Sequence, residues 1–117
     1  MRAAGDVFEQ RACAELERAG LKLLARNYNT RFGELDLVML DRDTVVFVEV
    51  RHRRNASHGD AAASITAGKQ AKLIKAAALW RTTHAQWAQF NCRFDVVTYD
   101  GHPDHARMEW LRSAFEA

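Results

Sequence analysis

Proline, glycine and cysteine are scarce in this chain of 117 residues, and long apolar runs are missing. One proline and six glycines argue against a disordered or low-complexity chain. Two cysteines far apart, Cys13 and Cys92, exclude a dense disulfide framework and disfavour a zinc site. The longest apolar stretches, such as 45–48, are too short to cross a bilayer, and the N-terminal segment lacks the apolar core of a signal peptide. We therefore expect a soluble, cytoplasmic protein without membrane contacts.

The charge is unevenly distributed along a chain that has the length of a single domain, to which we assign residues 1–117. The net charge is only +2, but from Arg51 to Arg81 seven lysines and arginines accompany one acidic residue, Asp60. Such a segment suits a phosphate-bearing partner. A solvated loop and helix face explains the same charge equally well.

Hydrophobic periodicity predicts an α/β protein with a mixed sheet flanked by helices, in the order α-β-β-β-α-β-β. Both faces of the central hairpin are apolar, so we expect helices on both sides. The strand–helix–strand passage implies a parallel crossover. The predicted elements are a helix over 6–19, strands over 21–27, 35–40 and 44–50, a polar basic loop over 51–64, a helix over 66–84, strands over 92–99 and 108–111, and a short helix ending at Phe115.

The register of the central hairpin follows from its turn. A two-residue turn at 42–43 pairs Asp41 with Thr44. The same register puts Val38 opposite Phe47, Leu40 opposite Val45, Glu34 opposite Arg51 and Asp36 opposite Glu49. Because alternate residues of a strand share a face, this arrangement puts Leu35 on the same face as Leu37, and Arg51 on the same face as Glu49.

Asp36 and Glu49 then form a pair of facing carboxylates, with Cβ atoms about 4.5–5.5 Å apart. Two facing carboxylates repel each other, and burial strengthens the repulsion. A hard divalent cation such as Mg²⁺ would compensate the charge, and Arg51 would add positive charge beside it. The alternative is that both are ordinary strand acids, with Glu49 bridged to Arg51 and Arg53.

Glu9 is the candidate for a third acidic residue. It lies on the flank of the apolar stripe of the first helix, where it can lean toward the sheet edge. The spacing of Asp6 and Glu9 fits a capping box equally well, in which Glu9 only closes the start of the helix.

The residues resemble a known family. The matching positions are Gly5, Glu9, Arg26-Asn27, Gly33-Glu34-Leu35-Asp36-Leu37, Val46-Phe47-Val48-Glu49-Val50-Arg51, Arg53, Arg54, Lys69-Gln70, Arg93-Phe94-Asp95-Val96-Val97, Glu109-Trp110 and Ala114-Phe115. This set spans nearly the whole chain and resembles the YraN family of bacterial proteins, whose fold is similar to the PD-(D/E)XK restriction endonucleases and Holliday-junction resolvases. The GELD and FVEVR segments are its most specific part.

The resemblance implies roles for individual residues. Glu9, Asp36 and Glu49 would hold Mg²⁺ or Mn²⁺, and Gln70 lies in the helix that often contributes a polar residue to such sites. Arg51 stands where the nuclease motif usually has lysine. Arginine stays charged and binds phosphate, but it cannot release a proton as lysine can.

The sequence thus predicts a metal-dependent endonuclease that hydrolyses DNA, with branched or structured DNA as a candidate substrate and repair or recombination as the setting. Arg53, Arg54, Lys69, Lys72 and Lys75 are the expected contacts to the nucleic-acid backbone. A nuclease-fold module that binds nucleic acid without cutting it, and a protein-interaction scaffold with vestigial carboxylates, are the alternatives. The resemblance is compatible with a homodimer.

Overall fold

The computed structural model describes residues 3–54 and 62–117. The elements follow the predicted order α-β-β-β-α-β-β. They are α1 Ala3–Arg18, β1 Lys22–Thr30, β2 Gly33–Asp41, β3 Thr44–Arg53, α2 Ala67–Thr83, β4 Asn91–Asp100 and β5 Arg107–Phe115, with 3₁₀ turns at Ala62–Ser64, Ala85–Trp87 and Pro103–His105.

The five strands form one mixed sheet in the order β1-β2-β3-β4-β5. The pair β3–β4 is parallel, as the strand–helix–strand passage predicted, and the other neighbouring pairs are antiparallel. The predicted hairpin register is confirmed for three pairs: Val38 with Phe47, Leu40 with Val45 and Asp41 with Thr44. The predicted pairs Asp36–Glu49 and Glu34–Arg51 do not form, because the pairing of β2 with β3 ends at Leu37 and Val48.

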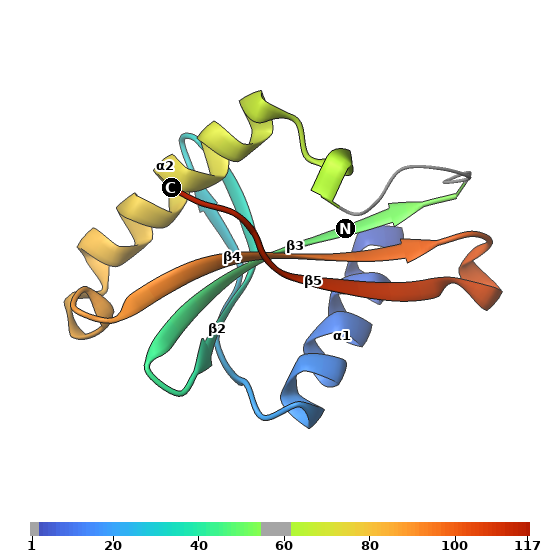
Figure 1. Ribbon diagram of the computed structural model, residues 1–117, viewed down its shortest axis with the longest axis horizontal. Coiled ribbons are helices and arrows are strands. Elements are labelled where there is room, and N and C mark those ends of the chain that lie inside the picture. The colour runs from blue at the N-terminus through green and yellow to red at the C-terminus, as the bar shows by residue number, and fades with distance from the viewer. Residues whose placement is uncertain (1–2, 55–61) are drawn as a thin grey trace.

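Each face of the sheet carries its own apolar core, and α1 and α2 cover opposite faces (Figure 1). On the α2 face, Trp80 is 1% exposed and packs edge-on to Phe47, with ring centroids 5.8 Å apart. On the α1 face, Phe8 and Leu16 pack on Met39. The prediction of helices on both sides is therefore confirmed. In the described part of the chain, no helix combines the length and the apolar character that crossing a bilayer requires.

The predicted terminal helix is wrong, because residues up to Phe115 belong to β5. The strand is irregular: its register against β4 shifts between Phe94 and Val96, and Ser113 has φ 52°. The buried Asp95 accepts a hydrogen bond from the Ser113 backbone N–H at 3.0 Å, and Phe115 stacks on Phe94 at 4.9 Å. These contacts hold the segment extended against β4.

The start of the predicted basic loop is also wrong. Arg51, His52 and Arg53 belong to β3 and pair in parallel with Thr98, Tyr99 and Asp100. A strand forms here because β4 offers hydrogen-bonding partners that the hairpin sequence alone does not reveal. Residues 55–61 of that loop lie outside the described residues.

Candidate metal and nucleic-acid site

The candidate site lies where β2 and β3 separate. Their backbone pairing runs from Asp41–Thr44 to Leu37–Val48. Beyond that point β2 continues beside β1, as far as Gly33 opposite Thr30, while β3 continues beside β4, and the two pairs diverge in Figure 1. At the fork, the Asp36 carboxylate accepts a hydrogen bond from the Val50 backbone N–H at 3.0 Å. The Asp36 side chain thus accepts the hydrogen bond that a backbone carbonyl of β2 would accept in a regular ladder.

A bend in β2 turns Asp36 toward α1. Regular alternation predicts Leu35 and Leu37 on one face, and this expectation is wrong, since Leu35 packs in the α2 core and Leu37 in the α1 core. The bend coincides with Asn27 on the neighbouring strand, which has φ 51°. The change of face in β2 thus lies opposite a left-handed residue of β1.

Glu9 reaches this fork from the second turn of α1. Its side chain is buried, and its carboxylate accepts a hydrogen bond from the Asn27 side-chain amide at 2.6 Å. Because α1 already begins at Ala3, Asp6 is not an N-cap residue, and the capping-box alternative for Glu9 is wrong. The Glu9 carboxylate therefore ties α1 to β1.

Three carboxylates converge here. One oxygen each from Glu9, Glu34 and Asp36 lies within 4.8 Å of the others. The hairpin register placed Glu34 opposite Arg51, and Glu34 was not among the predicted site residues. The signal was present in the chain, because Glu34 is two positions before Asp36 on the same strand and shares its face.

Glu49 adjoins this group from β3 and lies between two cations. Its Oε2 is 3.7 Å from Arg51 Nη1 and 3.7 Å from Lys69 Nζ, while its Oε1 is buried and has no hydrogen-bond partner among the described residues. Lys69 reaches it from the first turn of α2, which Thr66 fixes by accepting a hydrogen bond from the Lys69 backbone N–H. Lys69, expected on the nucleic-acid surface, is therefore also a neighbour of the acidic group.

Asp36 and Glu49 both have raised pKa values, and burial is the main cause. Burial, followed by the negative charge of Glu49, raises the pKa of Asp36 to about 8, and Glu9 and Glu34 act in the same direction. Burial also raises the pKa of Glu49, although Lys69 and Arg51 oppose that change. A proton, or another cation in its place, is therefore favoured at Asp36 near neutral pH.

The donor set fits a hard divalent cation. Carboxylate oxygens are the ligands that Mg²⁺ prefers, and two oxygens on opposite sides of Mg²⁺ are about 4.2 Å apart at ideal distances. The three oxygens, which all lie within 4.8 Å of one another, are thus close enough together to share one ion. The unpartnered Glu49 Oε1 offers a further acceptor for an ion or its bound water.

Gln70 is not brought to the carboxylates by any hydrogen bond in the described residues. Its amide nitrogen donates to the Ile65 backbone oxygen at 3.1 Å and so stabilises the start of α2. The assignment of Gln70 to the site stays a prediction that this geometry does not support.

The basic residues divide into two groups. Arg53 forms a bidentate ion pair with Asp100, at 2.8 and 2.9 Å, and Arg81 donates to the backbone oxygens of Ala88 and Phe90. Both guanidinium groups are thus committed within the protein. The exposed cations of this stretch are Arg54, Lys72 and Lys75, and Lys75 also lies over the Phe32 ring at 5.7 Å.

Comparison with known proteins gives the family. The family described as "Uncharacterised protein family UPF0102" matches residues 8–99, which include Glu9, Glu34, Asp36, Glu49 and Lys69. The chain is a UPF0102 protein. This family is the YraN family of the sequence resemblance, which is therefore confirmed.

Similar UPF0102 proteins match almost end to end. A UPF0102 protein of Stutzerimonas stutzeri (strain A1501) is 50% identical over 114 residues, which cover 97% of this chain and 95% of the relative. One from Pectobacterium carotovorum subsp. carotovorum (strain PC1) is 52% identical over 115 residues, covering 97% and 94%. One from Pseudomonas aeruginosa (strain LESB58) is 50% identical over 115 residues, covering 97% and 92%. UPF0102 membership thus applies to the chain as a whole.

Proposed function

We propose that this UPF0102 protein is a metal-dependent endonuclease that hydrolyses phosphodiester bonds in DNA, with branched or otherwise structured DNA as the first substrates to test. The observation that carries the proposal is the convergence of Glu9, Glu34 and Asp36 within 4.8 Å, beside Glu49 and two cations. A buried acidic group of this kind is unfavourable for stability alone, so a role in binding a cation is the physical reason for it.

Glu9, Glu34 and Asp36 would hold Mg²⁺ or Mn²⁺, and Glu49 would accept a hydrogen bond from a water molecule at the ion. When bound, the metal supplies Lewis-acid stabilisation of the phosphoryl oxygens and an activated water. In hydrolysis a water oxygen forms a new bond to phosphorus, the bond to one ester oxygen breaks, and the proton released by water ends on that leaving oxygen or in solvent.

Arg51 and Lys69 would stabilise the charge that develops on the phosphoryl group. Each lies 3.7 Å from Glu49 Oε2, so their positive charges border the carboxylates on the side of β3 and α2. The arginine serves only as a fixed charge and hydrogen-bond donor. Lys69 can also release a proton, and so offers the property that Arg51 lacks.

The test compares cleavage of a four-way junction, a flap and a linear duplex in Mn²⁺ by wild type and Asp36→Asn at matched purity. Removing one ligand charge is expected to lower the cleavage rate at least about 100-fold while DNA binding in chelator is retained. Asp104→Asn is the matched control, since Asp104 is an exposed acid in the turn Pro103–His105. Equal rates for wild type and Asp36→Asn would identify a contaminating nuclease and reject the proposal.

A non-catalytic module that binds nucleic acid is the second candidate, and Arg51 is the observation that favours it. Arginine is better suited to a lasting bidentate contact with phosphate than to proton transfer. If this candidate is right, neither wild type nor Arg51→Lys cleaves DNA, and chelation leaves the affinity for DNA unchanged. Cleavage that rises in Arg51→Lys, with binding unchanged, would exclude it.

A further inference from the structure

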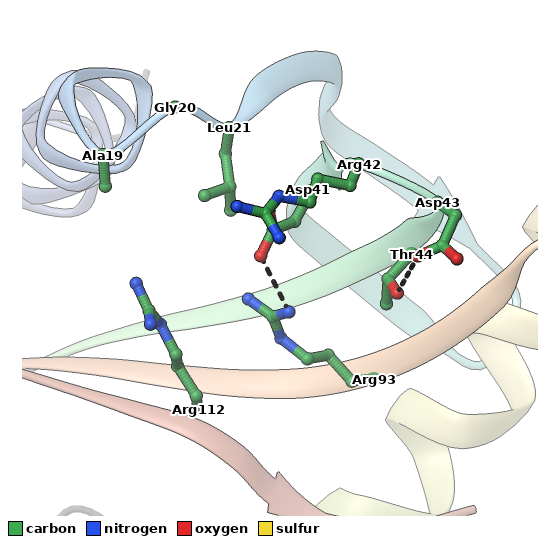
Figure 2. A pocket seen from close by; sticks show the side chains of 9 residues that line it. All are labelled: Ala19, Gly20, Leu21, Asp41, Arg42, Asp43, Thr44, Arg93 and Arg112. Carbon is green, nitrogen blue, oxygen red and sulfur yellow. Dashed lines mark hydrogen bonds and ion pairs between the residues drawn. The ribbon is translucent and has the colours of Figure 1, made fainter.

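A hollow lies at the far end of the β2–β3 hairpin from the carboxylates. It has a volume of about 480 Å³ and is lined by the end of α1 and its turn (19–21), by the hairpin turn (41–44), and by Arg93 and Arg112. We call it the hairpin hollow. The segment that follows α1, residues 19–21, borders the hollow on one side, as Figure 2 shows.

Three guanidinium groups from three different segments border the hairpin hollow. Arg93 is fixed in place, because Asp41 accepts a hydrogen bond from it at 2.9 Å and Asp95 accepts two more at 3.0 and 3.3 Å. Arg42 and Arg112 make no ion pair within residues 3–54 and 62–117; Arg112 lies over the Trp110 ring, 4.0 Å from its centroid. Two cations without a carboxylate partner therefore face one cavity (Figure 2).

One of the two negative charges at the hairpin hollow is paired with a cation. Asp41 bonds to Arg93, and Asp43 accepts a hydrogen bond from Thr44 Oγ1 at 3.2 Å and is drawn beside it in Figure 2. The end of α1 is also closed: Leu21 N–H donates to Leu16 O and Gly20 N–H to Glu17 O, which is a Schellman motif. The last carbonyl groups of α1 thus have hydrogen-bond donors, and they repel an anion less than carbonyl groups without a donor would.

Arg42 occupies a position that a turn fills more readily with glycine or asparagine. Its φ is 59°, and a two-residue hairpin turn prefers Gly, Asn or Asp where φ is positive. Holding a long side chain in this conformation costs about 1 kcal/mol. A binding role for the Arg42 side chain would explain why this position carries arginine in spite of the unfavourable backbone conformation.

We propose that the hairpin hollow binds a phosphate group of a nucleic-acid backbone, through Arg42 and Arg112 with Arg93 as a fixed third donor. Guanidinium groups match phosphate oxygens in charge and in hydrogen-bond geometry. The assignment to a nucleic acid, rather than to free phosphate, rests on the proposed function. From Asp36 to Asp41 the strand spans about 17 Å, which corresponds to about five nucleotides of a duplex strand.

The experiment has two arms, both in chelator so that cleavage plays no part. In the first, inorganic phosphate is titrated while the Nε–H resonances of the arginines are followed by NMR. In the second, binding of a 20-base-pair duplex is measured by anisotropy from 50 to 200 mM salt. The variants are Arg42→Asn, which keeps a residue that tolerates positive φ, Arg112→Gln, and the double variant. Arg107→Gln removes the same charge at the other end of β5 and is the control.

Millimolar phosphate is expected to shift the Arg42 and Arg112 resonances in wild type. The double variant is expected to lower the slope of log K against log salt by about 0.9, the effect of one lost phosphate contact, whereas Arg107→Gln leaves it unchanged. A phosphate response without a change in slope would show a site for a free anion and overturn the backbone assignment. No phosphate response would overturn the site itself. Neither result depends on whether the carboxylates support cleavage.

Discussion

Asp36 is placed where its ionisation opposes folding. The carboxyl is buried beside Glu49, Glu9 and Glu34, and its pKa is raised to about 8 from 3.8. The folded state therefore binds the proton more tightly than the unfolded state does. For an acid with a raised folded pKa, stability falls as the pH rises from about 4 to about 8. The sign is the opposite of the usual behaviour of a salt-bridged aspartate.

Asp36→Asn is accordingly expected to stabilise the metal-free protein. The amide oxygen can still accept the Val50 N–H, and the amide nitrogen can donate to a neighbouring carboxylate. We expect no gain at pH 4 and a gain on the order of 2–4 kcal/mol at pH 9, read from urea denaturation in chelator. Asp104→Asn is the control and should change stability by less than about 0.5 kcal/mol at either pH. A variant less stable than wild type at pH 9 would show that Asp36 serves the fold.

At the scale of elements, β5 depends on one buried carboxylate. Asp95 has no exposed surface and accepts hydrogen bonds from the guanidinium of Arg93, the indole of Trp110 at 3.0 Å and the backbone of Ser113. These donors come from β4 and from both sides of the irregularity in β5. Asp95 therefore fixes the register of the last strand.

Asp95→Asn is expected to destabilise the protein by about 3 kcal/mol, because the half-buried Arg93 guanidinium loses one of its two charged partners and some buried donors lose their acceptor. Trp110→Phe removes a single one of these hydrogen bonds and should cost about 1 kcal/mol. Urea denaturation measures both. Similar losses for the two variants would mean that the Trp110 bond, rather than the whole network, carries the stabilisation.

The same elements show what the sequence could and could not predict. The hairpin register followed from a turn two residues long, since local chemistry sets it. The terminal helix was wrong because β5 is held by Asp95 and Phe94, which lie about 20 residues earlier in the chain. The change of face at Asp36 was missed for a similar reason, since it coincides with a left-handed Asn27 on another strand. Glu9 was predicted as a neighbour of Asp36, but its partner Asn27 was not.

At the scale of the whole molecule, the basic middle segment serves more than one purpose. Arg53 and Arg81 bond to acceptors within the protein, and Arg51 and Lys69 lie at Glu49. Lys72, one turn after Lys69 on α2, is exposed. Fewer basic residues are therefore available to contact a nucleic acid than the charge of the segment suggests. A pair of variants can test this difference.

Lys72→Gln and Arg81→Gln remove the same charge from the same helix but are expected to act differently. Lys72→Gln should lower the salt slope of duplex binding by about 0.9, the effect of one phosphate contact, with stability unchanged. Arg81→Gln should cost about 2 kcal/mol of stability, since its two hydrogen bonds to Ala88 and Phe90 are lost, and leave the slope as it is. Anisotropy from 50 to 200 mM salt and urea denaturation give the two readouts. If both variants lowered the slope equally, binding would follow net charge alone, and α2 would present no specific phosphate contact.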